Sequence, residues 1–324
     1  VHKRGEELVK VQGDKINLEF LYSNVAYAGA KYHIYSAETI YSQDKKTKVH
    51  NSGELVAELT TGTNGSAITG DLHLGKYRVV EQQAPTNLVI GKTEAERTQY
   101  VTLSYAGQTV ELAQSETTYT NNRPEVKVKA VKKSHNDNAK LAGVVFGLFD
   151  VSDIKDGKGN VLLSKDAIIQ QVTSDTNGDA KFTADIPIGY SYYIKELRAP
   201  EYYYKSDAVY TFKYAYTNDS TYTYTFEDVF ANEEVRGEVH VSKIDIDAQD
   251  FISQGDASLA GAKYGLYAAE DINHPNKKSG LVHKKNELVA QGVISNKGTL
   301  DFKNLYLGNY FVKEIAAGTG YRVD

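Results

Sequence analysis

The sequence predicts an all-β protein built from three tandem β-sandwich domains. Its 324 residues correspond to two or three domains of ordinary size. Tyr is common at 25 residues and Pro is rare at 5, a composition that favours strands. The stronger evidence is a set of sequence markers that recur in the same order along the chain, because internal repeats of this kind indicate one fold used several times.

The first marker is a turn of small residues followed by alternating apolar positions, which predicts a strand. It occurs at residues 28–35, 141–149 and 259–267.

The second marker is a Leu/Ile-Gly turn followed by a strand pattern that ends in Glu, at residues 74–81, 188–196 and 307–314. A Gly-containing turn precedes each copy. The separation from the Gly of the first marker to the Glu of the second is 52, 53 and 53 residues. Such constant spacing predicts the same fold in all three copies.

The third marker is a strand-like run that ends in Asn121 in the first copy and in Asn232 in the second. A Lys follows each Asn after eleven residues, at Lys132 and Lys243. Period two places these Lys side chains on the apolar face of their strand. Residues 1–3 match the same strand and give Lys3 as the first-copy counterpart.

The markers predict domain boundaries near Pro124 and Arg236, and hence domains at 1–124, 125–236 and 237–324. The connections are short and carry no Gly/Ser-rich linker, which predicts a stiff string. The third copy reaches Asp324 before a closing Asn strand, so we expect it to be C-terminally incomplete, either cut there or completed by another segment. The chain begins at Val1 and is interpreted as a mature or excised fragment.

Two departures from the repeat are expected to form antiparallel strands. Residues 4–27 insert a hairpin around residues 12–14 in the first copy. The second copy carries Tyr-rich runs between residues 202 and 226, which could alternatively present a stacking surface for a glycan or a protein.

These ordered markers resemble the Cna protein B-type and SpaA-like pilin repeats, which are Ig-like/prealbumin-like β-sandwiches of Gram-positive surface adhesins and pilins. The resemblance covers nearly the whole chain. It implies a structural stalk of a sortase-anchored adhesin or pilin, located outside the cell on the cell wall. It also implies intramolecular isopeptide bonds between a first-strand Lys and a last-strand Asn, assisted by an acid on a middle strand.

Three sets of residues match the family pattern. The first copy supplies Lys3, Glu81 and Asn121, with Asn122 as a competing partner, and the second copy supplies Lys132, Glu196 and Asn232, with the out-of-phase Lys133 beside Lys132. The third copy supplies Lys243 and Glu314 and no Asn. No LPxTG or Tyr-Pro-Lys-Asn motif occurs, so sortase polymerisation stays open.

The chemistry explains why the family needs these residue types. Lys is an ammonium ion in water, and burial lowers its pKa toward the neutral nucleophile. A buried Glu can stay protonated, hydrogen-bond the Asn carbonyl oxygen and shuttle protons until ammonia leaves. Each domain would react once, so the chain is not expected to be an enzyme acting on an external substrate.

Composition and motifs argue against several other classes of function. The formal net charge is −5, which does not suit a nucleic-acid groove, and no apolar run reaches the length of a membrane span. The absence of Cys excludes disulfides and zinc-thiolate sites. Residues 175–179 predict a turn rather than a calcium loop, and Asp245, Asp247 and Asp250 predict a solvated loop, so no metal and no cofactor are expected. The partners expected are a host extracellular protein or glycan, or other pilus or surface subunits; the alternative to a stalk is a ligand-binding adhesin module.

Overall fold

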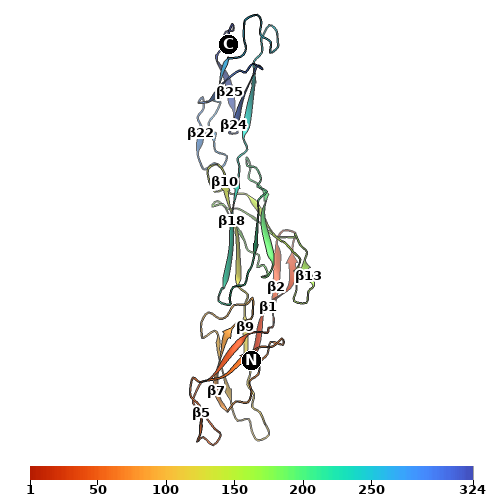
Figure 1. The fold of residues 1–324 in the computed structure, drawn as a ribbon, viewed down its shortest axis with the longest axis vertical. Coiled ribbons are helices and arrows are strands. Elements are labelled where there is room, and N and C mark those ends of the chain that lie inside the picture. The colour runs from red at the N-terminus through yellow and green to blue at the C-terminus, as the bar shows by residue number, and fades with distance from the viewer. Residues whose placement is uncertain (324) are drawn as a thin grey trace.

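The computed structural model describes residues 1–323, and within this range the chain forms strands and turns and no helix. Asp324, the last residue of the third expected domain, lies outside the described residues. Three sandwiches follow one another along the long axis of an elongated molecule, with the C-terminal domain at one end (Figure 1). None of the described residues form a helix with the length and apolar character needed to cross a bilayer.

The first domain packs a three-stranded sheet, in the order β2-β1-β9, against a four-stranded sheet, in the order β6-β3-β7-β8, with β4-β5 as a small extra pair. Its core contains the fully buried Tyr32 and Tyr77. The strands are β1 (His2–Gly13), β2 (Leu18–Ala26), β3 (Lys31–Ser36), β4 (Ile40–Tyr41), β5 (Lys48–His50), β6 (Leu55–Thr60), β7 (Gly75–Gln83), β8 (Thr98–Leu103) and β9 (Thr118–Asn121).

The second domain repeats this plan with the sheets β15-β10-β18 and β14-β11-β16-β17 and the small pair β12-β13. The inward positions of both sheets, such as Phe146 and Ile194, are fully buried. The strands are β10 (Glu125–Ser134), β11 (Val145–Asp150), β12 (Ile154–Lys155), β13 (Val161–Leu163), β14 (Ile168–Thr173), β15 (Asp179–Phe182), β16 (Ser191–Arg198), β17 (Val209–Lys213) and β18 (Thr223–Asn232).

The third domain has a smaller version of the same plan, with the sheets β19-β24 and β23-β20-β25 and the pair β21-β22. Among the described residues no strand pairs with β19 at the position that β18 takes beside β10. The strands are β19 (Gly237–Ser242), β20 (Lys263–Ala268), β21 (Ile272–Asn273), β22 (Leu281–His283), β23 (Leu288–Val293), β24 (Thr299–Leu305) and β25 (Tyr310–Ala316).

The hairpin expected around residues 12–14 is present and links the first two domains. It consists of the antiparallel pair β1 and β2, which extends beside the second domain (Figure 1). Its Leu8 and Phe20 are at most 6% exposed and belong to the hydrophobic core of the second domain. Tyr22 adds a hydrogen bond to the Asp185 carbonyl and lies under the Arg123 guanidinium, 3.4 Å from its ring centroid. The junction between the first two domains is therefore apolar and well packed.

Candidate functional site

The second domain brings Lys132, Glu196 and Asn232 together in its core. Strand β10 runs parallel to β18, with Lys132 opposite Phe230 and Asn232 two residues further along. Glu196 comes from β16 in the facing sheet, so the three side chains meet across the interior of the sandwich. Each of them is at most 1% exposed.

The contacts in this triad join each carboxylate oxygen to one nitrogen. Lys132 Nζ donates to Glu196 Oε2 at 2.7 Å and to Asn232 Oδ1. Asn232 Nδ2 donates to Glu196 Oε1 at 2.7 Å. From the sequence we expected the Glu to hydrogen-bond the Asn carbonyl oxygen, and the structure differs. The amide N–H of Asn232 faces the carboxyl group of Glu196, and its carbonyl oxygen faces the amine of Lys132.

Burial sets the electrostatics of the amine. Desolvation lowers the pKa of Lys132, and the hydrogen bond and charge of Glu196 compensate only in part. The ring of Phe146 lies 5.9 Å from Nζ and keeps water from that side. The neutral, nucleophilic form of Lys132 is therefore far more accessible than for a Lys in water.

The first domain brings the matching residues together in the same register, but one contact differs. Asn121 Oδ1 has no hydrogen-bond partner, whereas Asn232 Oδ1 accepts a hydrogen bond from Lys132. In the parallel pair β1 and β9, Lys3 lies opposite Tyr119, and Asn121 again follows two residues later. Lys3 Nζ donates to Glu81 Oε1 at 2.6 Å, and Asn121 Nδ2 donates to Glu81 Oε2 at 3.1 Å. The three side chains are at most 5% exposed, and desolvation lowers the pKa of Lys3.

The strand register distinguishes residues that the sequence left in competition. Asn121 points into the first domain, whereas Asn122 is exposed. Lys132 is fully buried, whereas Lys133 is half-buried and lies on the other face of β10. The structure therefore places Asn121 and Lys132, and not their neighbours, beside the two glutamates.

A turn glycine holds the backbone of each Lys, a feature that we did not predict from the sequence. Lys3 N donates to Gly65 O and Lys132 N donates to Gly178 O, both at 2.7 Å, and Lys243 N donates to Gly298 O at 2.9 Å. Both Gly65 and Gly178 have positive φ, and a Cβ there would meet the Lys carbonyl oxygen within 2.7 Å. The recurring Gly in these turns was the available signal, since only Gly permits both the conformation and the close approach.

The third domain contains a different arrangement. Lys243 Nζ lies 2.9 Å from Glu314 Oε1 and donates to the Tyr264 hydroxyl at 3.2 Å. Its side chain is 14% exposed, and no Asn joins the pair among the described residues. Partial desolvation lowers the pKa of Lys243, but the hydrogen bonds to Glu314 and Tyr264 outweigh it, so the net pKa is raised. This Lys is an ammonium ion in an ion pair.

The acidic loops considered as cation sites use their carboxylates internally. Asp175 Oδ1 accepts hydrogen bonds from the backbone of Asn177 and Asp179, which closes a hairpin turn. Asp245 accepts hydrogen bonds from two backbone N–H groups and from the hydroxyl of Tyr321. Neither loop gathers three metal-ligating side chains in the part of the chain that the structure describes.

The Tyr-rich segment of the second domain lies only partly at the surface. Tyr203, Phe212 and Tyr214 are at most 7% exposed, while Tyr202 and Tyr204 are 42% and 56% exposed. Phe212 stacks on Phe226, with 4.5 Å between ring centroids. Much of this aromatic content therefore serves to pack strands.

The chain belongs to the SpaA prealbumin-like fold domain family. The family model matches three times, at residues 23–118, 126–229 and 237–324. The predicted fold class, three tandem prealbumin-like β-sandwiches, and the resemblance to SpaA-like repeats are thereby confirmed.

Solved structures of other proteins resemble this chain. The Bacillus anthracis TIE protein shows the same fold and superposes with a TM-score of 0.56 at 19% identity, over 95% of this chain and 51% of that one. The chain thus spans about half the length of that protein. The shaft pilin SpaA from Lactobacillus rhamnosus GG matches with a TM-score of 0.24 at 14% identity, over 72% of this chain and 96% of that one. Among curated proteins none matches this chain.

Proposed function

We propose that the chain is a stalk segment of a Gram-positive cell-surface protein, an adhesin or pilin, whose first two domains are locked by Lys–Asn isopeptide bonds. The observation that carries the proposal is the pair of buried triads, Lys3–Glu81–Asn121 and Lys132–Glu196–Asn232, which recur at the same strand register. An ordinary Lys–Glu ion pair at the surface would be exposed, would lack an Asn beside it and would not recur at the same register in two domains. The reaction that these groups suit is amide formation with loss of ammonia.

The contacts in the second domain provide a balanced route for this reaction. One proton passes from Lys132 Nζ to Glu196 Oε2 and leaves a neutral amine beside a neutral acid. The amine attacks Asn232 Cγ, and the acid gives its proton to Nδ2. Ammonia leaves as the Cγ–Nδ2 bond breaks, and Glu196 takes one proton from Nζ. The new Nζ–Cγ amide is neutral, and the acid ends protonated as it was before the attack.

Folding supplies the proximity that this chemistry needs. Holding amine and carboxamide together can remove about 7–11 kcal/mol of the barrier. The reaction consumes its own residues, so each domain reacts once and no turnover follows. The proposal therefore assigns no enzymatic activity on an external substrate.

The position of the two bonds suits a stalk that carries tension. Each bond joins the first strand of a domain to its parallel last strand, and the chain then passes from Asn121 to Lys132 of the next domain in eleven residues. Force would follow these short covalent segments and leave the sandwiches unloaded. In the second domain the closed loop spans 100 residues, and by analogy with disulfides such a closure stabilises by about 4–5 kcal/mol.

A stalk of this kind would lie outside the cell, attached to the cell wall, with its domains in a rigid row. The packed hairpin between the first two domains, the family membership and the absence of Cys support an extracellular stalk. Other pilus or surface subunits are the partners that this role requires. A binding role toward a host protein or glycan would need a surface that these contacts do not define.

The intact mass of the full chain tests the proposal. Each bond removes one ammonia, so we expect a mass about 34 Da below that of the sequence. The deficit should fall to about 17 Da in Lys3→Ala and in Lys132→Ala. Lys243→Ala is the matched control and should keep both losses, because its site has no Asn.

A second pair of variants tests the partner in the first domain. Asn121→Ala should show a mass deficit of one ammonia instead of two, because only Asn121 faces Glu81. Asn122→Ala should keep the full deficit of two. A wild-type mass equal to that of the sequence would exclude the crosslinks and leave plain sandwiches.

A further inference from the structure

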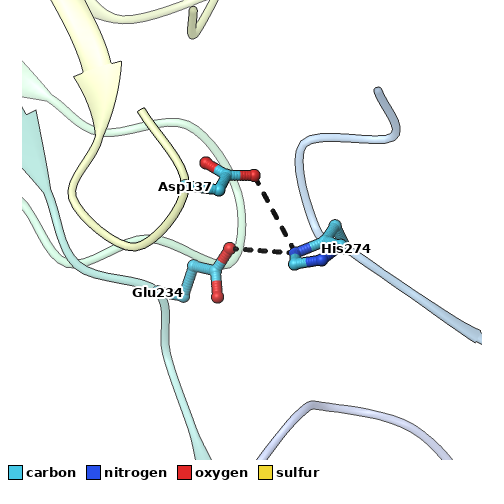
Figure 2. A group of neighbouring side chains, drawn as sticks. All are labelled: Asp137, Glu234 and His274. Carbon is cyan, nitrogen blue, oxygen red and sulfur yellow. Dashed lines mark ion pairs between the residues drawn. The ribbon is translucent and has the colours of Figure 1, made fainter. Parts of the chain in front are cut away.

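The junction between the second and third domains contains a cluster of three metal-ligating side chains that no part of the proposed function uses. Figure 2 shows Asp137 and Glu234 facing His274 across the junction. Asp137 lies in the loop after β10, Glu234 lies two residues beyond the end of β18, and His274 follows β21. The cluster therefore joins the ends of two strands of the second domain to a loop of the third.

The separations in the cluster are those of ligands around an ion. His274 Nδ1 lies 3.7 Å from Glu234 Oε1 and 3.9 Å from Asp137 Oδ2, and the three ligand atoms all lie within 4.8 Å of one another. These distances are too long for hydrogen bonds. Two atoms bound at about 2.1 Å to a tetrahedral ion lie about 3.4 Å apart, so small movements would complete the geometry.

Glu234 supplies independent evidence for a missing ligand. Its residue is 3% exposed, yet Oε1 has no hydrogen-bond partner and faces the other two ligands. Nδ1 of His274 is likewise buried without a partner. A buried acceptor without a donor is costly, and a cation between Oε1 and Nδ1 would satisfy both atoms.

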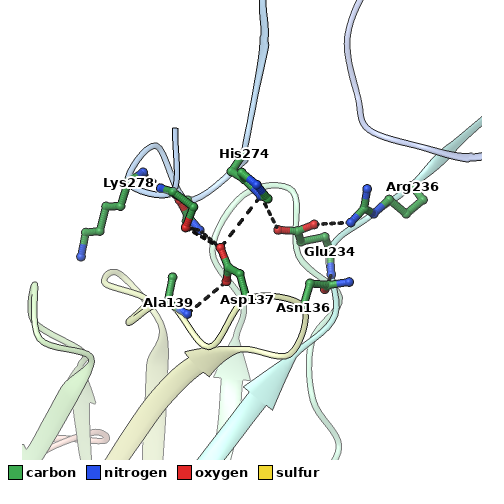
Figure 3. A network of polar contacts seen from close by, with 9 residues as sticks. Asn136, Asp137, Ala139, Glu234, Arg236, His274 and Lys278 are labelled. Atoms are coloured by element: carbon green, nitrogen blue, oxygen red, sulfur yellow. Dashed lines mark hydrogen bonds and ion pairs between the residues drawn. The ribbon is translucent and has the colours of Figure 1, made fainter. Parts of the chain in front are cut away.

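Surrounding groups hold the two carboxylates in place, as Figure 3 shows. Arg236 Nη2 donates to Glu234 Oε2 at 2.6 Å and leaves Oε1 free, while its guanidinium stacks on Tyr306. Asn276 Nδ2 donates to Asp137 Oδ2 at 2.7 Å. Hydrogen bonds of this kind orient metal-ligating carboxylates in known sites.

The Ser279 hydroxyl and the Ala139 N–H also donate hydrogen bonds to the carboxylate of Asp137. A cleft of about 630 Å³, lined in part by His274, Lys277 and Tyr306, lies beside the cluster.

We propose that Asp137 Oδ2, Glu234 Oε1 and His274 Nδ1 bind one divalent transition-metal ion of the zinc type. One imidazole and two carboxylates suit zinc, whereas calcium requires six to eight oxygen ligands. The ion would pin the third domain to the ends of β10 and β18, the two strands that carry Lys132 and Asn232.

Calorimetric titration of Zn²⁺ into the chelator-treated full chain tests the site. We expect one saturable ion per chain in the wild type, and Co²⁺ at the same site should give a tetrahedral absorption spectrum. His274→Ala and Glu234→Gln should each weaken the affinity for zinc at least about tenfold. Loss of a residue that only hydrogen-bonds a ligand already costs about that much, and these two residues are ligands themselves. Glu234→Gln preserves the shape of the side chain and keeps an oxygen for Arg236.

His283→Ala is the matched control, because this imidazole also lies edge-on to Tyr306 but pairs only with Glu287. It should leave the zinc isotherm unchanged. Equal binding in wild type and His274→Ala, or no binding in the wild type, would overturn the proposal. If the wild type binds no zinc, the cluster would be a polar contact between the two domains and not a metal site.

Discussion

The second and third domains carry a Lys and a Glu at matching positions, yet the pKa values of the two amines shift in opposite directions. Lys132 is fully buried and its pKa is lowered, whereas Lys243 is 14% exposed and its pKa is raised. Both face a Glu within 3 Å. The sequence motif is thus the same, and the packing around it decides the direction in which the pKa of the Lys shifts.

Two neighbours account for this difference. Strand β18 covers the open side of Lys132, while among the described residues β19 has no such neighbour beside Lys243. The aromatic residue opposite the Glu is Phe146 in the second domain and Tyr264 in the third. The Tyr264 hydroxyl accepts a hydrogen bond from Lys243 Nζ and so stabilises the ammonium ion, whereas Phe146 offers Lys132 only its ring, 5.9 Å from Nζ.

The largest expected contrast is in thermal stability. Lys132→Ala removes the proposed crosslink, worth about 4–5 kcal/mol, and should lower the unfolding temperature of the second domain by about 15 °C or more. Lys243→Ala removes no crosslink but leaves the largely buried Glu314 without its partner, so it should cost less than Lys132→Ala. Calorimetry of the full chain compares the two variants. Equal shifts would show that the two sites are equivalent.

The next contrast concerns a buried carboxyl at the end of β11. Asp150 is fully buried, and desolvation raises its pKa to about 6, whereas Ala268 takes the matching place in β20. A raised pKa gives a contribution to stability that is fully present below pH 3.8 and lost as pH rises through 6. From pH 4 to pH 7 the second domain should therefore lose on the order of 1–3 kcal/mol through this group.

Denaturation of Asp150→Asn at both pH values measures this effect. The variant should lack this component of the pH dependence, and the third domain should lack it already. A variant with the wild-type pH profile would assign the titration to another group.

Much of the fold could be predicted from the sequence, because it depends on local period and on the spacing of the repeats. The strand period put Lys132 on the inner face, and the resemblance to SpaA-like repeats grouped it with Glu196 and Asn232. The choice between Asn121 and Asn122 stayed open, since two adjacent Asn residues at a strand end require the register with β1.

The features that could not be predicted depend on which domain a segment contacts. Leu8 and Phe20 showed an apolar face, but nothing in their spacing indicated that this face packs into the second domain. Glu234 and His274 lie forty residues apart and belong to no motif, so only the domain junction brings them together.

A smaller contrast is whether the stability of each domain rises or falls as the pH becomes alkaline. In Asn232→Ala, which cannot form the crosslink, Lys132 keeps its lowered pKa, so the folded state binds fewer protons than the unfolded state. The stability of the second domain should then rise as pH approaches the ordinary value of 10.5. Lys243 has a raised pKa, so its contribution is present below 10.5 and is lost as pH rises further. Denaturation between pH 7 and 11 should therefore give opposite slopes for the two domains; slopes of one sign would contradict the assignment.

The smallest expected effect isolates the hydroxyl of Tyr264. Tyr264→Phe gives the third domain the aromatic residue of the second and removes a hydrogen bond to Lys243 Nζ that contributes about 0.5–1.5 kcal/mol. The pKa of Lys243 should fall, because partial desolvation is then opposed by Glu314 alone. NMR titration of isotopically labelled lysine measures the change, with Tyr267→Phe as the control on the same strand. An unchanged pKa would mean that Glu314, rather than the aromatic residue, determines the pKa of the amine.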